Sequence, residues 1–210
     1  MLDFQTLLIY AIPLIFAITV HEVAHGWVAN LRGDGSAKML GRLTLNPVKH
    51  IDPVGTLLVP AVLYFSGSPF LFGWAKPVPI NFNALKSPKH DMILVALAGP
   101  ASNFIMALLW FLLVIFIADA PSEPLLKMAG FGIAINLVLG VFNLLPLPPL
   151  DGSRVVSSLL PNRLAYEYNK LEVYGLYILL GLLFLGIFEK LVLPIVNAMQ
   201  TAMFSAAGFI

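Results

Sequence analysis

Two histidines and a glutamate inside a long apolar stretch are the residues of this sequence best placed to carry out chemistry. His21 and His25 are four residues apart, so on a helix both imidazoles project from one face and can bind one zinc ion. Glu22 lies beside them as a candidate general base. Titratable side chains are costly inside a membrane helix, so those found there are usually functional. The segment therefore predicts a zinc site with its own base.

A catalytic zinc usually has three protein ligands, and the best third ligand is Asp151. The sequence has no cysteine, so the ligands must be His, Asp or Glu. Asp151 follows an apolar segment, 143–150, whose prolines break a helix, which places the aspartate on irregular backbone at membrane depth. The alternative is that Asp151 caps the helix that begins near Gly152, and both roles can hold together.

Matched depth in the membrane is the argument that connects Asp151 to the histidines. His21 lies about ten residues before the basic end of the first apolar run, which is roughly 15 Å along a helix. Asp151 comes near the end of a later run that returns to the same side. We therefore expect the three side chains to meet.

The chain that must position these groups has the composition of an integral membrane protein. Of the 210 residues, 59% are hydrophobic and only 11% are charged, whereas soluble domains carry about a quarter charged residues. We expect a single membrane-embedded domain, residues 1–210, with a motif-bearing core at about 7–154. The formal net charge of +1 gives no reason to expect a nucleic-acid partner.

The apolar runs predict an all-α polytopic bundle of about four to six hydrophobic segments. Expected spans cover residues 7–31, 92–118, 131–145 and 173–188. The last run, 191–210, is either a span or an interfacial helix. The loop that follows the first run carries four basic residues against one acidic residue, so the positive-inside rule places it in the cytoplasm.

A second feature of the bundle is an apolar segment, 54–74, that has basic residues on both sides. A single crossing would put these flanks on opposite sides of the membrane, so we expect a hairpin or re-entrant segment. Lys76-Pro77-Val78-Pro79-Ile80-Asn81 follows it, and each proline disfavours helix at the preceding residue. This stretch predicts a short strand-like insertion.

Taken in order, the motifs resemble those of the site-2 protease family of intramembrane zinc metalloproteases. They are H-E-x-x-H at 21–25, G-P-A-S-N at 99–103, N-L-L-P at 143–146 and L-D-G at 150–152. The resemblance covers about residues 7–154 and is to the compact members that lack PDZ or CBS modules.

The resemblance implies a role for each of four residues. In that family two histidines and an aspartate bind one zinc ion and a glutamate activates water, which by resemblance are His21, His25, Asp151 and Glu22. The implied function is a zinc-dependent endopeptidase that cleaves transmembrane proteins within or near their spans. We expect a multi-pass protein in the lipid bilayer of a prokaryotic plasma membrane, with the active site toward the cytoplasm.

The expected chemistry places further demands on the site. A zinc ion lowers the pKa of bound water to about 7, and Glu22 is then the base that takes its proton. A helical substrate must unwind before attack, and segments 78–82 and 145–150 are candidates to hold it as a strand edge. Asn103 and Asn143 are candidates to bind substrate or the oxyanion. For Asn103 an interhelical hydrogen bond is an equal alternative.

Two other classes of protein remain as alternatives. A metal-ion transporter also places histidines and acids in a membrane, but it would carry acids on several helices, whereas the spans beyond these motifs are almost purely apolar. A non-catalytic scaffold descended from a protease would have lost Glu22 or a ligand. All four groups are present in this sequence.

Overall fold

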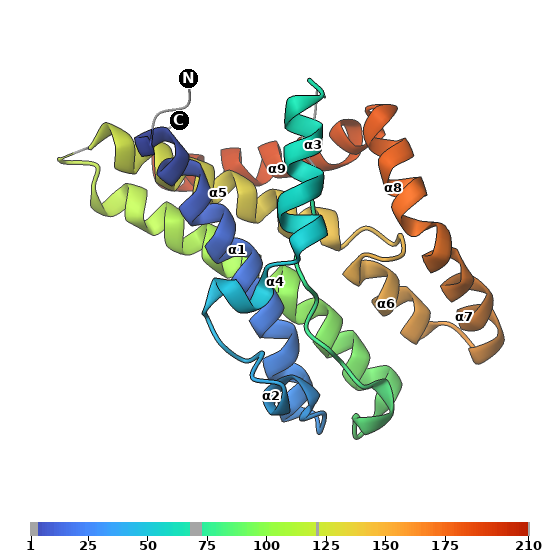
Figure 1. Cartoon of the computed structure of the whole chain (residues 1–210). Coiled ribbons are helices and arrows are strands. Elements are labelled where there is room, and N and C mark those ends of the chain that lie inside the picture. Colours follow the sequence, from blue (N-terminus) through green and yellow to red (C-terminus); the bar gives the residue numbers. More distant parts are fainter. Residues whose placement is uncertain (1–3, 68–72, 121, 210) are drawn as a thin grey trace.

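The computed structural model describes residues 4–67, 73–120 and 122–209. Over these residues the protein is helical and contains no β-strand. The predicted all-α class is therefore confirmed, and Figure 1 shows the course of the chain.

Three long helices form the body of the protein. They are α1 (Phe4–Leu31), α4 (Pro88–Phe116) and α5 (Glu123–Asn143), and each is long and apolar enough to cross a membrane. Glycines of α5 allow close packing: a Cβ on Gly132 would overlap the Trp110 indole, and a Cβ on Gly140 would lie 2.7 Å from the Phe104 ring. The protein is thus a multi-pass membrane protein built on three helices that are each long enough to cross the membrane.

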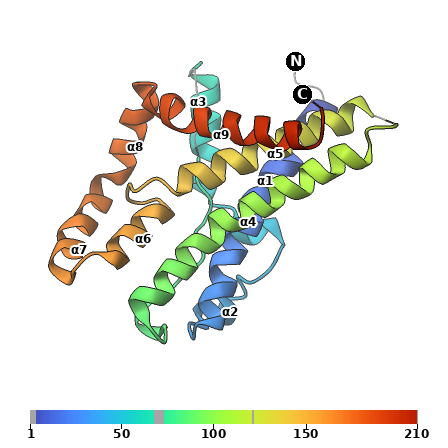
Figure 2. The same cartoon turned by 180° about the vertical axis from the view of Figure 1, so that it is seen from behind.

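Among the described residues, four shorter α-helices follow α5, with a 3-10 helix, Lys170–Tyr174, between the second and the third. They are α6 (Asp151–Leu159), α7 (Asn162–Asn169), α8 (Gly175–Phe184) and α9 (Ile187–Ala206). Figure 2 shows α6, α7 and α8 as an arm beside the three-helix body, with α9 returning along α5. Val192 and Val196 of α9 are buried in the same cluster as Leu137 of α5.

The arm departs from the simple spans that composition predicted. The expected span 173–188 is interrupted at Gly186, where a left-handed backbone with φ of +64° separates α8 from α9. The segments on either side, 162–184 and 187–206, meet at a bend of 76°. The described residues therefore contain three membrane-length helices, or four if the bent pair is one span.

The apolar segment 54–74 leaves the body and returns to it. A helical turn, Pro53–Leu58, leads into α3 (Val59–Phe65), which extends toward the top of the view in Figure 1. The backbone N–H of Trp74 donates to the Gly55 carbonyl at 3.1 Å, so the two ends of the segment meet. This arrangement is that of the predicted hairpin, of which residues 68–72 lie outside the described part of the chain.

The strand-like insertion predicted at 76–81 is wrong. These residues, which we call the strap, are extended but have no partner strand. Pro77 and Pro79 set an extended backbone but have no N–H to donate, so a ladder of hydrogen bonds cannot form along them. Segment 145–150, the other candidate for a strand edge, also forms no strand and consists of turns between α5 and α6.

The strap is instead tied to the end of α1 and to the short segment that follows it. Gly33, with φ of +114°, ends α1, and Asp34 beyond it accepts the N–H groups of Ser36 at 2.9 Å and Asn81 at 2.6 Å. Arg42, three residues past α2 (Ser36–Met39), donates to the Lys76 carbonyl at 2.7 Å. The strap is therefore held over the face of α1.

Asp34 is a buried carboxylate whose negative charge strengthens the hydrogen bonds that it accepts. Burial acts to raise the pKa of Asp34, but hydrogen bonds from Ser36 and Asn81 outweigh it and hold that pKa below its usual value. A group whose pKa is lowered by folding stabilises the fold above its unfolded pKa, near 4. That contribution is lost as the pH falls through the folded pKa.

We predict that Asp34→Asn lowers the stability of the purified protein in detergent by about 1–3 kcal/mol at neutral pH, because an amide oxygen replaces a charged acceptor. The difference between parent and variant should shrink as the pH falls below the unfolded pKa and through the lowered folded pKa, because Asp34 itself then becomes protonated. Melting curves across this range measure it, with the exposed Asp119→Asn as the control. A difference that does not depend on pH would contradict this role for Asp34.

Candidate metal centre

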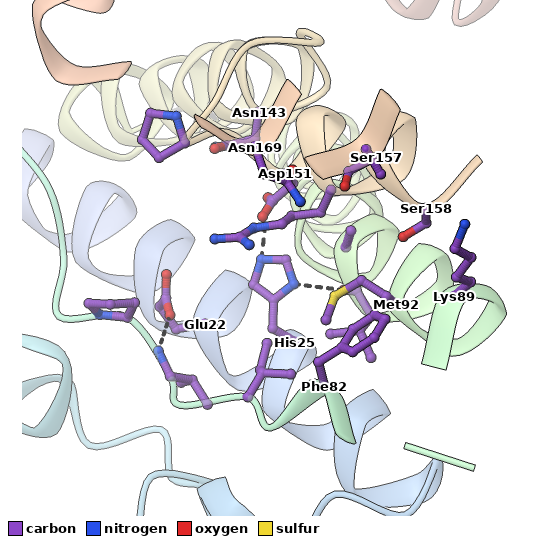
Figure 3. Close-up of a pocket in the computed structure, with 18 of the residues that line it drawn as sticks. Glu22, His25, Phe82, Lys89, Met92, Asn143, Asp151, Ser157, Ser158 and Asn169 are labelled. Carbon is purple, nitrogen blue, oxygen red and sulfur yellow. Dashed lines mark hydrogen bonds and ion pairs between the residues drawn. The ribbon is translucent and has the colours of Figure 1, made fainter. Parts of the chain in front are cut away.

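The structure brings His21, His25 and Asp151 together. The two histidine Nε2 atoms lie 3.0 Å apart, and Asp151 Oδ2 lies 3.2 Å from that of His21 and 3.3 Å from that of His25. In Figure 3, His25 on α1 points at Asp151, the first residue of α6. Residues separated by more than half of the chain thus form one cluster.

Two glycines make the approach of these elements possible. A Cβ on Gly99 of α4 would overlap the imidazole of His25 and lie 2.6 Å from that of His21. A Cβ on Gly152 would overlap the Leu144 carbonyl at the end of α5, against which α6 begins. The histidines therefore occupy the space that a side chain at Gly99 would fill, and α6 starts where only glycine fits.

A chain of amides fixes the proton on His21. The Asn136 amide nitrogen donates to the Gly132 carbonyl at 2.8 Å, so its oxygen faces Asn103 and accepts from Asn103 at 3.0 Å. The Asn103 nitrogen also donates to the Ala17 carbonyl, which leaves its oxygen 2.6 Å from His21 Nδ1. Because that oxygen can only accept, His21 Nδ1 carries the proton.

His25 is oriented in the same way by backbone. Its Nδ1 lies 2.7 Å from the Val95 carbonyl, which also can only accept. With a proton on each Nδ1, both Nε2 atoms face Asp151 Oδ2, and that oxygen has no hydrogen-bond partner among the described residues other than these two rings.

Three potential ligand atoms that converge in this way form a candidate site for a cation. Tetrahedral zinc with bonds of about 2.0 Å requires its ligand atoms to be about 3.3 Å apart, and the observed separations are 3.0–3.3 Å. Two imidazoles and one carboxylate are also a donor set used by catalytic zinc sites. The second hydrogen bond of each imidazole is the usual support for a metal-bound histidine. These residues therefore fit zinc.

The two amides that the sequence suggested for substrate or oxyanion binding occupy different places. Asn103 is fully buried behind His21 and makes the interhelical hydrogen bonds that were the alternative expectation. Asn143 lines the cavity beside the cluster, and its nitrogen donates to the Leu139 carbonyl of its own helix at 3.0 Å.

Asn136 is the residue of this network that sequence reasoning missed. It is fully buried, and its oxygen sets the orientation of Asn103. An amide in the middle of an apolar span was a usable signal, because such groups need a partner there.

Glu22 faces the cavity one residue from His21. Its side chain is half-buried, and one carboxylate oxygen, Oε2, accepts the backbone N–H of Val78 at 2.8 Å, as Figure 3 shows. The contact joins α1 to the strap. Glu22 thus lies where α1, the strap and the cavity meet.

A cavity of about 830 Å³ opens beside the cluster, between α1 with the strap and the arm. One wall is mostly apolar and consists of Pro77, Val78, Ile80, Phe82, Met92 and Val95. The wall from α6 and α7 is polar and includes Arg154, Ser157, Ser158, Asn162, Tyr166 and Asn169. The arrangement thus combines three ligand atoms for a metal with the carboxylate of Glu22. It also has room for a peptide-sized ligand.

Comparisons with known proteins place this geometry in context. A family model described as Peptidase family M50 matches residues 117–186. The chain is 40% identical over 194 residues to "Putative zinc metalloprotease YwhC" of Bacillus subtilis, covering 89% of this chain and 85% of that protein. It is 30% identical over 142 residues to "Putative zinc metalloprotease Rip2" of Mycolicibacterium smegmatis, covering 66% of this chain and 52% of that protein.

A shorter match is to "Zinc metalloprotease MJ0392" of Methanocaldococcus jannaschii, at 33% identity over 84 residues, or 39% of this chain and 23% of that protein. No solved structure has a significant match to the chain.

We predict that Gly99→Ala reduces the bound zinc of the purified protein at least tenfold, because the added methyl group needs the space of both imidazoles. Gly130→Ala is the matched control, since a Cβ there meets nothing within 4 Å. Metal content by plasma mass spectrometry, beside the melting temperature, measures the effect. Full zinc in a folded Gly99→Ala protein would contradict the packing described for the cluster.

Proposed function

Since the chain belongs to peptidase family M50, the site-2 protease family, we propose that it is a zinc-dependent endopeptidase that cleaves membrane proteins within or near their transmembrane segments. Two features support the intramembrane form of the activity. Two of the three clustered residues are on α1, a helix of membrane length, and the cavity beside the cluster opens between helices of the same bundle.

The convergence of two imidazole nitrogens and one carboxylate oxygen carries the proposal. His21, His25 and Asp151 would hold one zinc ion per chain through two nitrogens and one oxygen. When bound, the ion supplies a Lewis acid that activates water and polarises a peptide carbonyl. Asn103 and the Val95 carbonyl keep the Nε2 atoms available by holding the protons of both rings on Nδ1.

Glu22 supplies the proton transfers in this proposal. Its carboxylate takes a proton from the attacking water and returns it to the amine of the leaving chain. The position of Glu22, adjacent to a ligand and at the cavity, supports that role. Asn143, which also lines the cavity, is the remaining candidate to bind substrate or the developing oxyanion.

The strap is suited to hold a substrate that has unwound. A helix keeps its carbonyls in internal hydrogen bonds, so the cleaved residues must be extended before attack. Among the described residues, the carbonyls of Val78, Pro79 and Ile80 and the Ile80 N–H have no hydrogen-bond partner, and Val78 and Ile80 line the cavity. An extended peptide could pair with these groups through its backbone.

Orientation and location follow from charge and from the relatives. The segment after α1 carries Arg32, Lys38, Arg42 and Lys49, which favours the cytoplasm for the end of α1 that lies nearer the cluster. Relatives from Bacillus subtilis and Mycolicibacterium smegmatis support a prokaryotic plasma membrane. We assign residues 1–210 to a single membrane-embedded domain.

We predict that Glu22→Gln lowers the cleavage rate of a tagged single-span substrate by at least about a hundredfold, because an amide cannot take the proton. Zinc content should be unchanged, since Glu22 is not one of the three clustered ligands. Glu123→Gln is the matched control, an exposed glutamate at the start of α5. Cleavage by Glu22→Gln at the parent rate would exclude Glu22 as the base, and another group would then have to accept the proton.

A further inference from the structure

One hydrogen bond connects the proposed base to a segment remote from it in sequence. The Val78 N–H donates to Glu22 Oε2 at 2.8 Å, and no described residue donates to the other oxygen, Oε1. Pro77 and Pro79 on either side have no N–H. Val78 therefore carries the single backbone donor of the Pro-Val-Pro sequence, and that donor is directed at the carboxylate.

The position of this donor is fixed from both ends of the strap by buried charged side chains. At one end, Arg42 donates to the carbonyls of Lys76 at 2.7 Å and Pro77 at 3.4 Å. At the other end, Asp34 accepts the Asn81 N–H at 2.6 Å. Arg42 is 7% exposed and Asp34 is 1% exposed, so neither contact is a loose surface pair.

Packing sets the register of the strap on α1. The Val78 side chain is buried, and a Cβ on Gly26 would lie 2.8 Å from Val78 Cγ1. Gly26 is four residues after Glu22, so it lies on the same face of the helix one turn later. Val78 can approach α1 closely enough to reach Glu22 because position 26 has no side chain.

We propose that the strap is a positioning element of the active site, in which the Val78 N–H holds Glu22 Oε2 so that Oε1 is presented to the reacting water. Arg42 and Asp34 act through the strap and do not contact the substrate. The inference rests on the proposed role of Glu22 as base. A flexible glutamate gains from such restraint because small errors in the placement of a reacting group cost large factors in rate.

Two substitutions at one position separate the donor from the side chain. Val78→Pro removes the N–H and keeps a three-carbon side chain, in a segment that already holds prolines on both sides. Val78→Ala keeps the N–H and removes most of the side chain. The measurement is kcat and KM on a tagged single-span substrate, with zinc content determined on the same samples.

The expected result is a kcat for Val78→Pro about ten- to a hundredfold below that of Val78→Ala, with similar KM values and full zinc in both. Equal kcat values would overturn the proposal. A rise in KM alone would also overturn it, because it would assign the N–H to substrate binding. So would a rise in kcat, because it would show that the contact holds Glu22 in a less active position.

A second pair of variants keeps the test decisive if Val78→Pro does not fold. Arg42→Ala should lower kcat at full zinc content, and Arg42→Lys should restore part of it, because an ammonium group can donate to the same carbonyls. An Arg42→Ala protein with parental kcat would overturn the proposal. Failure of the parent to cleave any substrate would instead count against the proposed function, and that outcome is seen before any variant is compared.

Discussion

The convergence of three electron-rich atoms in a mostly buried site is the constraint around which the rest of the structure is arranged. His21 Nε2, His25 Nε2 and Asp151 Oδ2 lie within 3.3 Å of one another, and such a group is unfavourable unless a metal ion or a proton lies among its atoms. Binding of a cation would also join α1 to α6, so we infer that metal binding and the docking of the arm are coupled.

The elements around the cluster each remove one obstacle to that convergence. Gly99 provides the space for the rings, and Gly152 lets α6 begin against the end of α5. Asn103 directs one ring and is itself directed by Asn136, so α1, α4 and α5 are joined by one buried polar network. A fully satisfied network of this kind specifies a single packing arrangement of the helices. The apolar body of the bundle thus contains a precise polar centre.

The centre was more predictable from sequence than the elements that surround it. The spacing of His21 and His25 and the isolation of Asp151 in an apolar context each carry chemical information, and depth in the membrane was enough to predict that they meet. The strap was misjudged because prolines favour extended backbone but also remove the donors that a strand requires. The break at Gly186 was not foreseen, since hydropathy is continuous through it and one glycine decides the backbone.

X-ray absorption at the zinc edge of the purified parent protein is the most direct measurement of the central claim. The account predicts about one zinc per chain, four-coordinate, with scattering from two imidazoles and with light-atom distances of about 2.0–2.2 Å. The Asp151→Ala protein should lose most of its zinc or show an altered shell. A folded parent without zinc, or one whose zinc spectrum lacks imidazole scattering or is unchanged in Asp151→Ala, would contradict the account.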